Sequence, residues 1–301
     1  MLAPGAYGAV MSVDLSGRTV LITGGNTGLG LETAVSLAGM GAEVTITSRD
    51  AARGEAARAE ILERTGVAED RVEVMALDLA SIASIRSFAE GFLAAHPRLD
   101  VLVNNAGLIL SERTETEDGF ETTFGVNHLG HVLLTDLLLD RLKASAPSRI
   151  VVVASEAHKF ALDGLKFDDL QCHGHYWSYR VYGRSKLANI LFTRALAKRL
   201  EGTGVTVNAV HPGSVATRFG RDGDTSLTTA LTTFVARPFS RTPEEGARTQ
   251  VRVASDPELA EVSGAYFTNS EQADRRLARA ARDDDAAERL WAVSRELLGL
   301  D

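Results

Sequence analysis

Short runs of β-branched and apolar residues alternate with longer stretches of helical periodicity from residue 19 onward. This order predicts an α/β fold, in which parallel strands form one sheet and the helices between them cover both of its faces. The runs are almost continuously apolar, as expected of strands buried on both sides. We predict strands at residues 19–23, 43–48, 72–76, 101–104, 149–154, 205–210 and 265–267. Helical patterns between them include residues 28–40, 51–65, 82–95, 120–141 and 184–201.

Seven strands with six or more helices make a doubly wound, Rossmann-type, seven-stranded parallel sheet. The sequence has no internal repeat and no Pro-, Gly- or Ser-rich linker, so we predict that residues 1–301 form a single domain. Residues 1–12 precede the first strand, and we expect them to be a mobile extension. They have neither the basic start nor the long apolar core of a signal peptide or membrane anchor.

Charge and cysteine content exclude several classes of partner. The net charge is -8 and no dense run of Lys or Arg occurs, which argues against a nucleic-acid partner. Cys172 is the only cysteine, so the chain cannot form an internal disulfide or a Cys-based zinc site. The histidines are scattered without metal-ligand spacing, and we predict no metal site. We expect a cytoplasmic protein that binds neither nucleic acid nor membrane.

A glycine-rich loop joins the first predicted strand to the first helix. Such a loop lets backbone N–H groups and the positive end of the helix dipole approach a pyrophosphate. No Gly-Lys-Ser/Thr follows, which excludes a P-loop, although a plain strand-to-helix connection remains an alternative. The loop predicts dinucleotide contacts from Gly24, Asn26, Thr27, Gly28, Leu29 and Gly30.

The second predicted strand ends in Ser48 and Arg49, where a dinucleotide fold places the residue that selects the ribose. An acidic residue there would accept hydrogen bonds from the 2′-hydroxyl of NAD. Ser48 and Arg49 can instead bind a 2′-phosphate, so we predict a preference for NADP(H) over NAD(H). Asp50 is more plausible as the N-cap of the next helix. A solvated surface charge is the alternative for Arg49.

Tyr182 and Lys186 are four residues apart in a helical pattern and so share one helix face. A free phenol titrates near pH 10, and a neighbouring ammonium lowers that pKa toward useful acid/base chemistry. Ser155 follows a predicted strand, at the edge of a parallel sheet where ligands bind. Its hydroxyl can hydrogen-bond a substrate oxygen. Tyr-x-x-x-Lys pairs are mostly structural, and Ser155 alone could be a polar strand-end residue.

An ordered set of motifs runs along the chain: Thr23-Gly24-x-x-x-Gly28-x-Gly30, Asp78-Leu79, Asn104-Asn105-Ala106-Gly107, Asn127, Ser155, Tyr182-x-x-x-Lys186 and Pro212-Gly213. This set resembles the short-chain dehydrogenase/reductase superfamily over roughly residues 15–270. More narrowly, the strings GGNTGLGLETA, LVNNAG, NHLGHVLLT, SKLANILFTRAL and VHPGSVAT are similar to the retinol-dehydrogenase-like and WW-domain-oxidoreductase-like branch.

The resemblance implies a role for each matched residue. Tyr182 would be the general acid/base, Lys186 would bind the nicotinamide ribose, Ser155 would orient the carbonyl, and Asn127 would hold a water that relays protons to Lys186. Cofactor contacts would come from Asp78 and Leu79 at the adenine, from Asn105, Ala106 and Gly107 at the adenosine ribose, and from Pro212, Gly213, Val215 and Thr217 at the nicotinamide. Taken singly, Asn127, Asp78 and the 104–107 turn also have purely structural interpretations.

We therefore expect an NADP(H)-dependent oxidoreductase that interconverts a carbonyl and an alcohol on a hydrophobic small molecule. The irregular segments 160–179 and 217–240 are candidate substrate lids, and we expect pocket-lining side chains from Phe160, Trp177, Tyr179, Phe219 and Phe234. The alternative is a catalytically silent NADP(H)-binding regulator or scaffold. The helices predicted at 120–141 and 184–201 could pair two chains, so we expect a homodimer or homotetramer.

Overall fold

The computed structural model describes residues 13–213 and 241–300. In this part of the chain eight strands form one sheet in the order β3-β2-β1-β4-β5-β6-β7-β8. Strands β1 to β7 all pair in parallel, as predicted, while β8 pairs antiparallel to β7. The strands are β1 (Thr19–Ile22), β2 (Glu43–Ser48), β3 (Val72–Ala76), β4 (Val101–Asn104), β5 (Ser148–Val153), β6 (Val205–His211), β7 (Tyr266–Thr268) and β8 (Glu271–Gln272).

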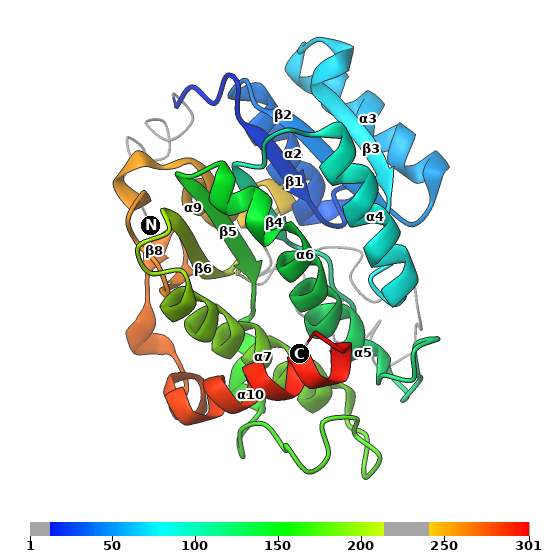
Figure 1. The fold of residues 1–301 in the computed structure, drawn as a ribbon, viewed down its shortest axis with the longest axis vertical. Coiled ribbons are helices and arrows are strands. Elements are labelled where there is room, and N and C mark those ends of the chain that lie inside the picture. Colours follow the sequence, from blue (N-terminus) through cyan, green and yellow to red (C-terminus); the bar gives the residue numbers. More distant parts are fainter. Residues whose placement is uncertain (1–12, 214–240, 301) are drawn as a thin grey trace.

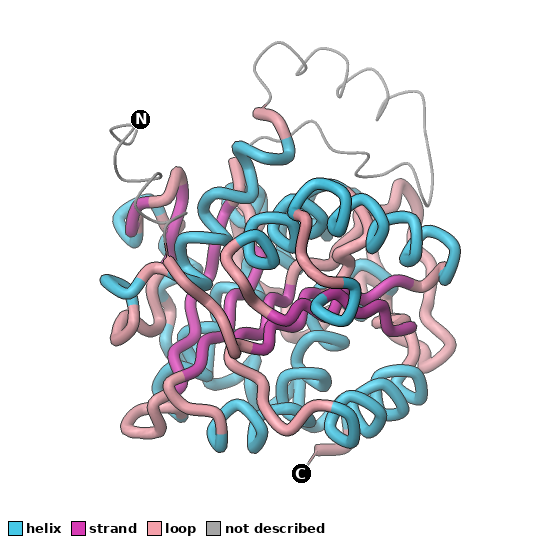
Figure 2. The backbone as a smooth tube through the Cα atoms, turned by 90° about the horizontal axis from the view of Figure 1, so that it is seen from above, coloured by secondary structure: helices cyan, strands magenta, loops and turns pink. Residues whose placement is uncertain are grey.

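Helices cover both faces of the sheet (Figures 1 and 2). One face packs against α2 (Gly28–Gly39), α3 (Ala51–Thr65) and α9 (Pro243–Ser255). The other packs against α4 (Ile82–Ala95), α6 (Gly130–Ala144), α7 (Ser178–Arg199) and α10 (Asp284–Leu298). Short turns of helix complete the chain: Glu69–Arg71, α5 (Thr122–Phe124), Gly125–Leu129, Glu156–Phe160, Pro257–Leu259, Asp274–Arg276 and Arg279–Arg282. The fold is therefore the doubly wound α/β architecture that the sequence predicts.

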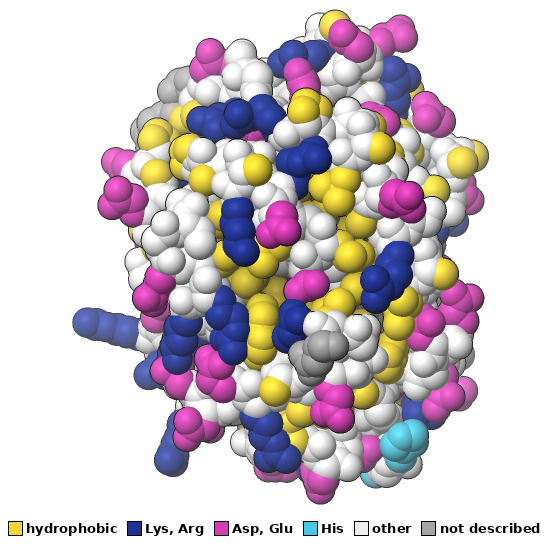
Figure 3. Space-filling model, viewed as in Figure 1, with side chains coloured by type: hydrophobic (Ala, Val, Ile, Leu, Met, Phe, Trp, Pro, Cys, Tyr) yellow, Lys and Arg dark blue, Asp and Glu magenta, His cyan; other side chains and the backbone are white. Residues whose placement is uncertain are grey.

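Two apolar cores result from the alternation of side chains along each strand. In β4, Val101 and Val103 belong to the core beneath α2 and α9, whereas Leu102 belongs to the core beneath α6 and α7. Burial on both faces explains why the strands are continuously apolar in sequence. In the view of Figure 3, charged side chains of both signs are mixed over the surface, and apolar side chains show mainly in its recessed centre.

The order of the strands reverses between β1 and β4, since the chain runs outward from β1 to β3 and then returns to the other side of β1. In open parallel sheets, ligands bind at the carboxyl ends of the strands beside such a switch point. The glycine-rich loop leaves β1 and the 104–107 turn leaves β4, so both lie at this point. The topology thus brings two sequence motifs about 80 residues apart into one site.

Two predicted helices differ from the structure. The helix expected at 120–141 begins at Thr122 and contains a π turn, Gly125–Leu129, in which the amide of Gly130 donates to the carbonyl of Gly125. The helix expected at 184–201 starts earlier, at Ser178, and so contains Tyr182 within its second turn. Sequence periodicity does not detect these boundaries, because helix ends are set by local hydrogen bonding rather than by the apolar pattern.

Helix α10 packs along α7 in the same chain (Figure 1). Trp291 stacks on Phe192 with ring centroids 5.9 Å apart, and Arg199 pairs with Glu288 over 2.6 Å. Most of α7 is consequently buried, with exposed residues only toward its ends. Helix α10 therefore covers part of the α7 surface that was expected to pair two chains, and the homodimer or homotetramer stays a prediction.

Candidate active site

The loop after β1 has the shape of a phosphate cradle. Gly24 adopts a φ of +63°, in the left-handed region that favours glycine. A Cβ on Gly30 would lie 2.3 Å from the carbonyl oxygen of Gly24, so only glycine fits where helix α2 meets the loop. Thr27, the N-cap of α2, makes no side-chain hydrogen bond to the helix. The first N–H groups of α2 are thus not capped by Thr27 and can bind an anion.

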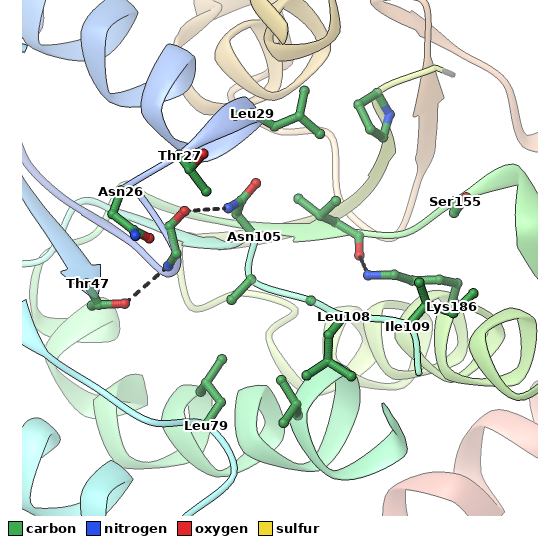
Figure 4. A pocket seen from close by; sticks show the side chains of 18 of the residues that line it. Asn26, Thr27, Leu29, Thr47, Leu79, Asn105, Leu108, Ile109, Ser155 and Lys186 are labelled. Carbon is green, nitrogen blue, oxygen red and sulfur yellow. Dashed lines mark hydrogen bonds between the residues drawn. The ribbon is translucent and has the colours of Figure 1, made fainter. Parts of the chain in front are cut away.

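The turn after β4 is locked to this loop. The backbone N–H groups of Asn105 and Ala106 both donate to Thr23 Oγ1, over 2.9 and 3.0 Å. The side-chain amide of Asn105 donates to the carbonyls of Thr23 and Gly24, over 2.8 and 3.3 Å. Figure 4 shows Asn26, Thr27 and Leu29 on one side of the pocket with Asn105 between them and Leu108. The 104–107 turn is therefore part of the cradle and not a simple connection.

The end of β2 carries the residues expected to select the ribose. The Ser48 hydroxyl donates to the carbonyl of Asp50 over 2.7 Å, so its proton serves the turn itself. Arg49 is exposed and lines the pocket, and no described residue pairs with its guanidinium. Asp50 accepts from the amide of Arg53 as the N-cap of α3, as predicted. Of the two predicted selectors, only Arg49 has its donors available to a ligand.

The segment after β3, with Asp78 and Leu79, lines one side of the pocket. Asp78 Oδ1 accepts from the amide of Ala80 over 2.9 Å, and the Asp78 amide donates to Ser84 Oγ. Asp78 thus has the structural role that the sequence left open, and it also lines the pocket. Leu79 is buried, and its side chain and carbonyl press on Gly130, where a Cβ would lie 2.6 Å from the Leu79 oxygen.

Three predicted catalytic side chains meet at the opposite end of the pocket. The ring centroid of Tyr182 lies 5.6 Å from Lys186 Nζ, and the Tyr182 hydroxyl hydrogen-bonds the side chain of Ser155. Lys186 is buried and donates from Nζ to the carbonyl oxygen of Val153 over 2.9 Å (Figure 4). Ser155 Oγ accepts from the amide of Ala157 over 3.1 Å, which fixes the hydroxyl oxygen and leaves its proton to another partner.

Burial dominates the acidity of this pair. It raises the pKa of Tyr182 to about 12, with the Ser155 hydrogen bond acting in the opposite direction. It also lowers the pKa of Lys186 to about 8. The sequence predicts a Tyr182 pKa below the usual value, whereas the structure raises it, because desolvation of the phenolate is the largest influence on this group. Tyr182 is a protonated phenol at neutral pH, suited to donating its proton.

Asn127 lies in the π turn and holds two elements in place. Its Oδ1 accepts from the amide of Leu108 over 2.8 Å, and its Nδ2 donates to the carbonyl of Leu108 and to Ser185 Oγ over 2.9 and 3.0 Å. Both amide protons are thus used, while Oδ1 retains one lone pair. A Cβ on Gly107 would lie 3.2 Å from Asn127 Oδ1 and 3.4 Å from Lys186 Nζ, so both atoms border the space beside Gly107.

One pocket of about 480 Å³ joins the cradle to the catalytic side chains. Its lining includes these predicted residues: Gly24, Asn26, Thr27, Gly28, Leu29, Gly30, Ser48, Arg49, Asp78, Leu79, Asn105, Ala106, Gly107, Ser155, Tyr182, Lys186, Pro212 and Gly213. Asn127 does not line it and acts from behind. Val215 and Thr217 lie outside the described residues.

Several lining residues were not predicted from the sequence: Thr47, Leu77, Leu108, Ile109, Leu110, Thr122, Val126, Val153, Ala154 and His211. Leu108, Ile109 and Leu110 follow directly on the 104–107 turn, and that proximity is the signal that could have identified them. Thr47 Oγ1 accepts from the amide of Gly24 over 3.2 Å, which ties the cradle to β2. Leu108, Ile109 and Leu110 give the segment after β4 a large part in the apolar wall of the pocket.

The aromatic residues expected in the pocket are elsewhere. Phe160, Trp177 and Tyr179 are 48%, 51% and 39% exposed and do not line it. Phe160 and Tyr179 make a T-shaped contact with each other at 6.4 Å. Their assignment to the pocket is wrong, because these three side chains lie at the surface at the two ends of the segment 160–179. Phe219 and Phe234 lie outside the described residues.

Residues 13–213 and 241–300 contain neither a metal-binding cluster nor a membrane-spanning helix. No group of three or more His, Cys, Asp or Glu side chains there could hold a metal ion. In that same part of the chain, none of the helices combines the length and the apolar content needed to cross a bilayer.

Comparison with known proteins gives the same family from sequence and from structure. The short chain dehydrogenase family profile matches residues 18–167 and 170–226. Mouse retinol dehydrogenase 14 is 48% identical over 295 residues, covering 95% of this chain and 87% of that protein. Human retinol dehydrogenase 12 is 49% identical over 289 residues, covering 96% and 89%.

Solved structures agree with the sequence matches. An uncharacterised protein from Mycobacterium paratuberculosis has a TM-score of 0.74 and 34% identity, covering 96% of this chain and 97% of that one. The Pseudomonas aeruginosa RhlG/NADP active-site complex has a TM-score of 0.66 and 27% identity, covering 85% and 95%. The chain belongs to the short-chain dehydrogenase/reductase family, in its retinol-dehydrogenase-like branch, and is an oxidoreductase acting on an alcohol or carbonyl group.

Proposed function

We propose that this protein is an NADP(H)-dependent oxidoreductase that interconverts a carbonyl and a primary or secondary alcohol on a hydrophobic small molecule, with Tyr182 as general acid/base. The observation that carries the proposal is the meeting of Tyr182, Ser155 and Lys186 at one end of a pocket whose other end is the glycine-rich cradle. A bound nicotinamide would supply or accept the hydride. Reduction then needs a proton donor at the substrate oxygen, and the buried phenol is protonated at neutral pH.

Ser155 and Lys186 would position the reacting groups. With its oxygen held by the amide of Ala157, the Ser155 hydroxyl can turn its proton toward a substrate oxygen that gains negative charge. The bond to Val153 uses one of the three Lys186 donors, which leaves the other two for the hydroxyls of a ribose. Asn127 Oδ1 and Lys186 Nζ border the same space beside Gly107, which supports a proton relay between them through a water molecule.

The guanidinium of Arg49, which pairs with none of the described residues, supports NADP(H) over NAD(H). It lies at the end of β2 within the pocket and can make charge-assisted hydrogen bonds to a 2′-phosphate. Asp78 and Leu79 would flank the adenine, and Asn105, Ala106 and Gly107 would border the adenosine ribose. Pro212 and Gly213 line the nicotinamide end, and we extend this contact to Val215 and Thr217.

The substrate class follows from the apolar wall. Leu108, Ile109, Leu110 and Val126 line the pocket, so the part of the substrate beyond its carbonyl or alcohol should be apolar. The relatives are named for retinol, a long apolar alcohol, which agrees with this class. We therefore place hydrophobic aldehydes, ketones and their alcohols first among the compounds to test.

The proposal also includes a single domain, a homo-oligomeric assembly and a cytoplasmic location. One sheet carries every described strand, which supports a single catalytic domain. Assembly into a homo-oligomer, a cytoplasmic location, and the absence of nucleic-acid and membrane partners remain predictions. A dimer would have to use a surface other than the one that α10 covers on α7.

The test is a panel of apolar aldehydes and ketones with NADPH, applied to the wild type and to Tyr182→Phe. The variant should lose about a hundredfold or more of kcat while binding NADPH normally, because the ring is kept and only the hydroxyl is removed. Near wild-type turnover by Tyr182→Phe would refute the mechanism. Tight NADPH binding by the wild type without turnover of any compound would favour the silent regulator.

A further inference from the structure

His131 lies in the first turn of α6, behind the pocket, and is 2% exposed. Its two ring nitrogens contact two different parts of the site. Nδ1 is 3.2 Å from the carbonyl oxygen of Asn127, and Nε2 is 2.9 Å from Thr23 Oγ1. One buried imidazole therefore spans from the π turn to the end of β1.

The partners of His131 define its tautomer. A carbonyl oxygen can only accept, so Nδ1 carries the proton and donates to Asn127. Nε2 then accepts from the hydroxyl of Thr23. That proton also lies within reach of the Val103 carbonyl oxygen, but the contact to Val103 is longer, 3.3 Å against 2.9 Å to Nε2. Burial, together with the charge of nearby Lys186 and His128, lowers the pKa of His131 to about 3, which agrees with a neutral ring. Neutral His131 thus has one donor and one acceptor, each matched by its neighbour.

The acceptor end of His131 fixes the cofactor cradle. When Thr23 donates to Nε2, its oxygen lone pairs face the amides of Asn105 and Ala106, which donate to it over 2.9 and 3.0 Å. The Asn105 side chain in turn lies so close to Gly30 that a Cβ there would be 2.6 Å from Asn105 Nδ2. The orientation of one hydroxyl therefore sets how the 104–107 turn packs on the glycine-rich loop.

The donor end of His131 fixes the catalytic helices. Asn127 binds the backbone of Leu108 and the hydroxyl of Ser185, which immediately precedes Lys186 on α7. Holding the Asn127 carbonyl from α6 steadies the π turn that presents this amide. The cradle and the catalytic side chains are thus joined through a single ring.

We propose that His131 is a positioning residue that couples the cofactor cradle to the catalytic helices, using one ring nitrogen for each. This inference rests on the proposed function for its catalytic half and on the hydrogen bonds alone for its structural half. His131 lies outside the pocket lining, so it acts through Thr23 and Asn127 and not on the substrate.

Two variants separate the two ends. His131→Asn keeps a donor at the position of Nδ1 and loses the acceptor, so NADPH should bind about fivefold more weakly with kcat at saturation within about twofold. His131→Gln keeps an acceptor at the position of Nε2 and loses the donor, so kcat should fall about fivefold with the NADPH Kd nearly unchanged. Kd is measured by NADPH fluorescence, and thermal unfolding shows that both variants are folded.

A double-mutant cycle between Thr23 and His131, measured on the free energy of unfolding, tests the link without cofactor or turnover. The losses of unfolding free energy in Thr23→Val and His131→Asn should be non-additive in the double variant. Thr23→Ser keeps the hydroxyl, so its coupling to His131 should match that of the wild type. Equal changes of Kd and kcat in both His131 variants, or an additive cycle, would overturn the proposal. A wild type that binds no NADPH would refute the proposed function instead, and the cycle would still decide the role of His131.

Discussion

Lys186 donates from Nζ to the carbonyl oxygen of Val153 over 2.9 Å, at the carboxyl end of β5. Val153 lies two residues before Ser155 in the chain, and the bond to its carbonyl holds the Lys186 ammonium beneath the ring of Tyr182. It also means that the charge of Lys186 is kept in a buried site by a backbone dipole rather than by a carboxylate. The protonation of this amine is therefore sensitive to pH close to neutrality.

The first prediction concerns the pH profile of kcat. Burial lowers the pKa of Lys186 to about 8, so the ammonium is present below that pH and is lost as the pH rises through it. Turnover should decline on an alkaline limb near pH 8. The Lys186→Arg variant keeps a charge that does not titrate in this range. The alkaline decline should therefore be absent from its pH profile, although its kcat is lower. An unchanged limb in this variant would assign the titration to another group.

The second prediction concerns Arg49. Replacing it with Ala should weaken NADPH binding by about tenfold or more, because the charge-assisted bonds to a 2′-phosphate are lost. NADH, which lacks that phosphate, should bind about equally to variant and wild type. The control is Arg86→Ala, which removes an exposed arginine outside the pocket. Equal loss of NADH and NADPH affinity would show that Arg49 does not select the cofactor.

The third prediction concerns the packing of α10. The Ser294 hydroxyl donates to His128 Nε2 over 3.0 Å, because His128 uses Nδ1 to donate to Asn189. Ser294→Ala leaves this buried acceptor without a partner and should cost about 1–3 kcal/mol of unfolding free energy. The matched control is Ser255→Ala, since Ser255 is also buried but donates to a carbonyl of its own helix. Urea unfolding compares the two, and equal losses would contradict the assignment.

The fourth prediction concerns acid stability. Burial lowers the pKa of His158, and it lowers the pKa of His128 and His211 to about 4 and of His131 to about 3. The unfolded chain, with values near 6.5, binds more protons between these limits, so stability falls as the pH drops below about 6.5. Each group removes up to about 1.4 kcal/mol per pH unit until its folded pKa is reached.

Unfolding in urea at pH 4 to 7 tests this slope. His211→Asn should flatten it measurably, because one of the titrating rings is gone. His175→Asn, which replaces an exposed histidine, should leave the slope unchanged. A stability that is independent of pH over this interval would contradict burial of the histidines in the neutral form.

The sequence predicts the parts of this molecule in which one signal dominates. Most of the strands from β1 to β7 are recognisable because burial on both faces makes them mainly apolar. The edge strand β3 is only partly buried and contains Glu73, yet its remaining residues are apolar. Strand β8 has only Glu271 and Gln272, both exposed, so no apolar pattern marks it. Tyr182 and Lys186 are predictable from their spacing, and the structure adds the partners of both, Ser155 and the Val153 carbonyl.

Other parts of the site depend on distances that no local pattern encodes. Trp177 and Tyr179 are aromatic and near Tyr182 in sequence, yet the start of α7 directs them to the surface. His211 is the last residue of β6 and has no partner at Nδ1 among the described residues, and its place in the pocket depends on where β6 ends. The acidity of Tyr182 could not be predicted because it depends mainly on burial, a tertiary property that no local pattern encodes.

The contact between α10 and α7 also has a consequence for synthesis on the ribosome. Arg199 and its partner Glu288 are 89 residues apart in the chain, so the catalytic helix is made well before the helix that covers it. During that interval the indole of Trp291 is not yet present to shield Phe192. A nascent chain therefore exposes an apolar stripe beside its future active site, and chaperone binding at this stage should favour that stripe.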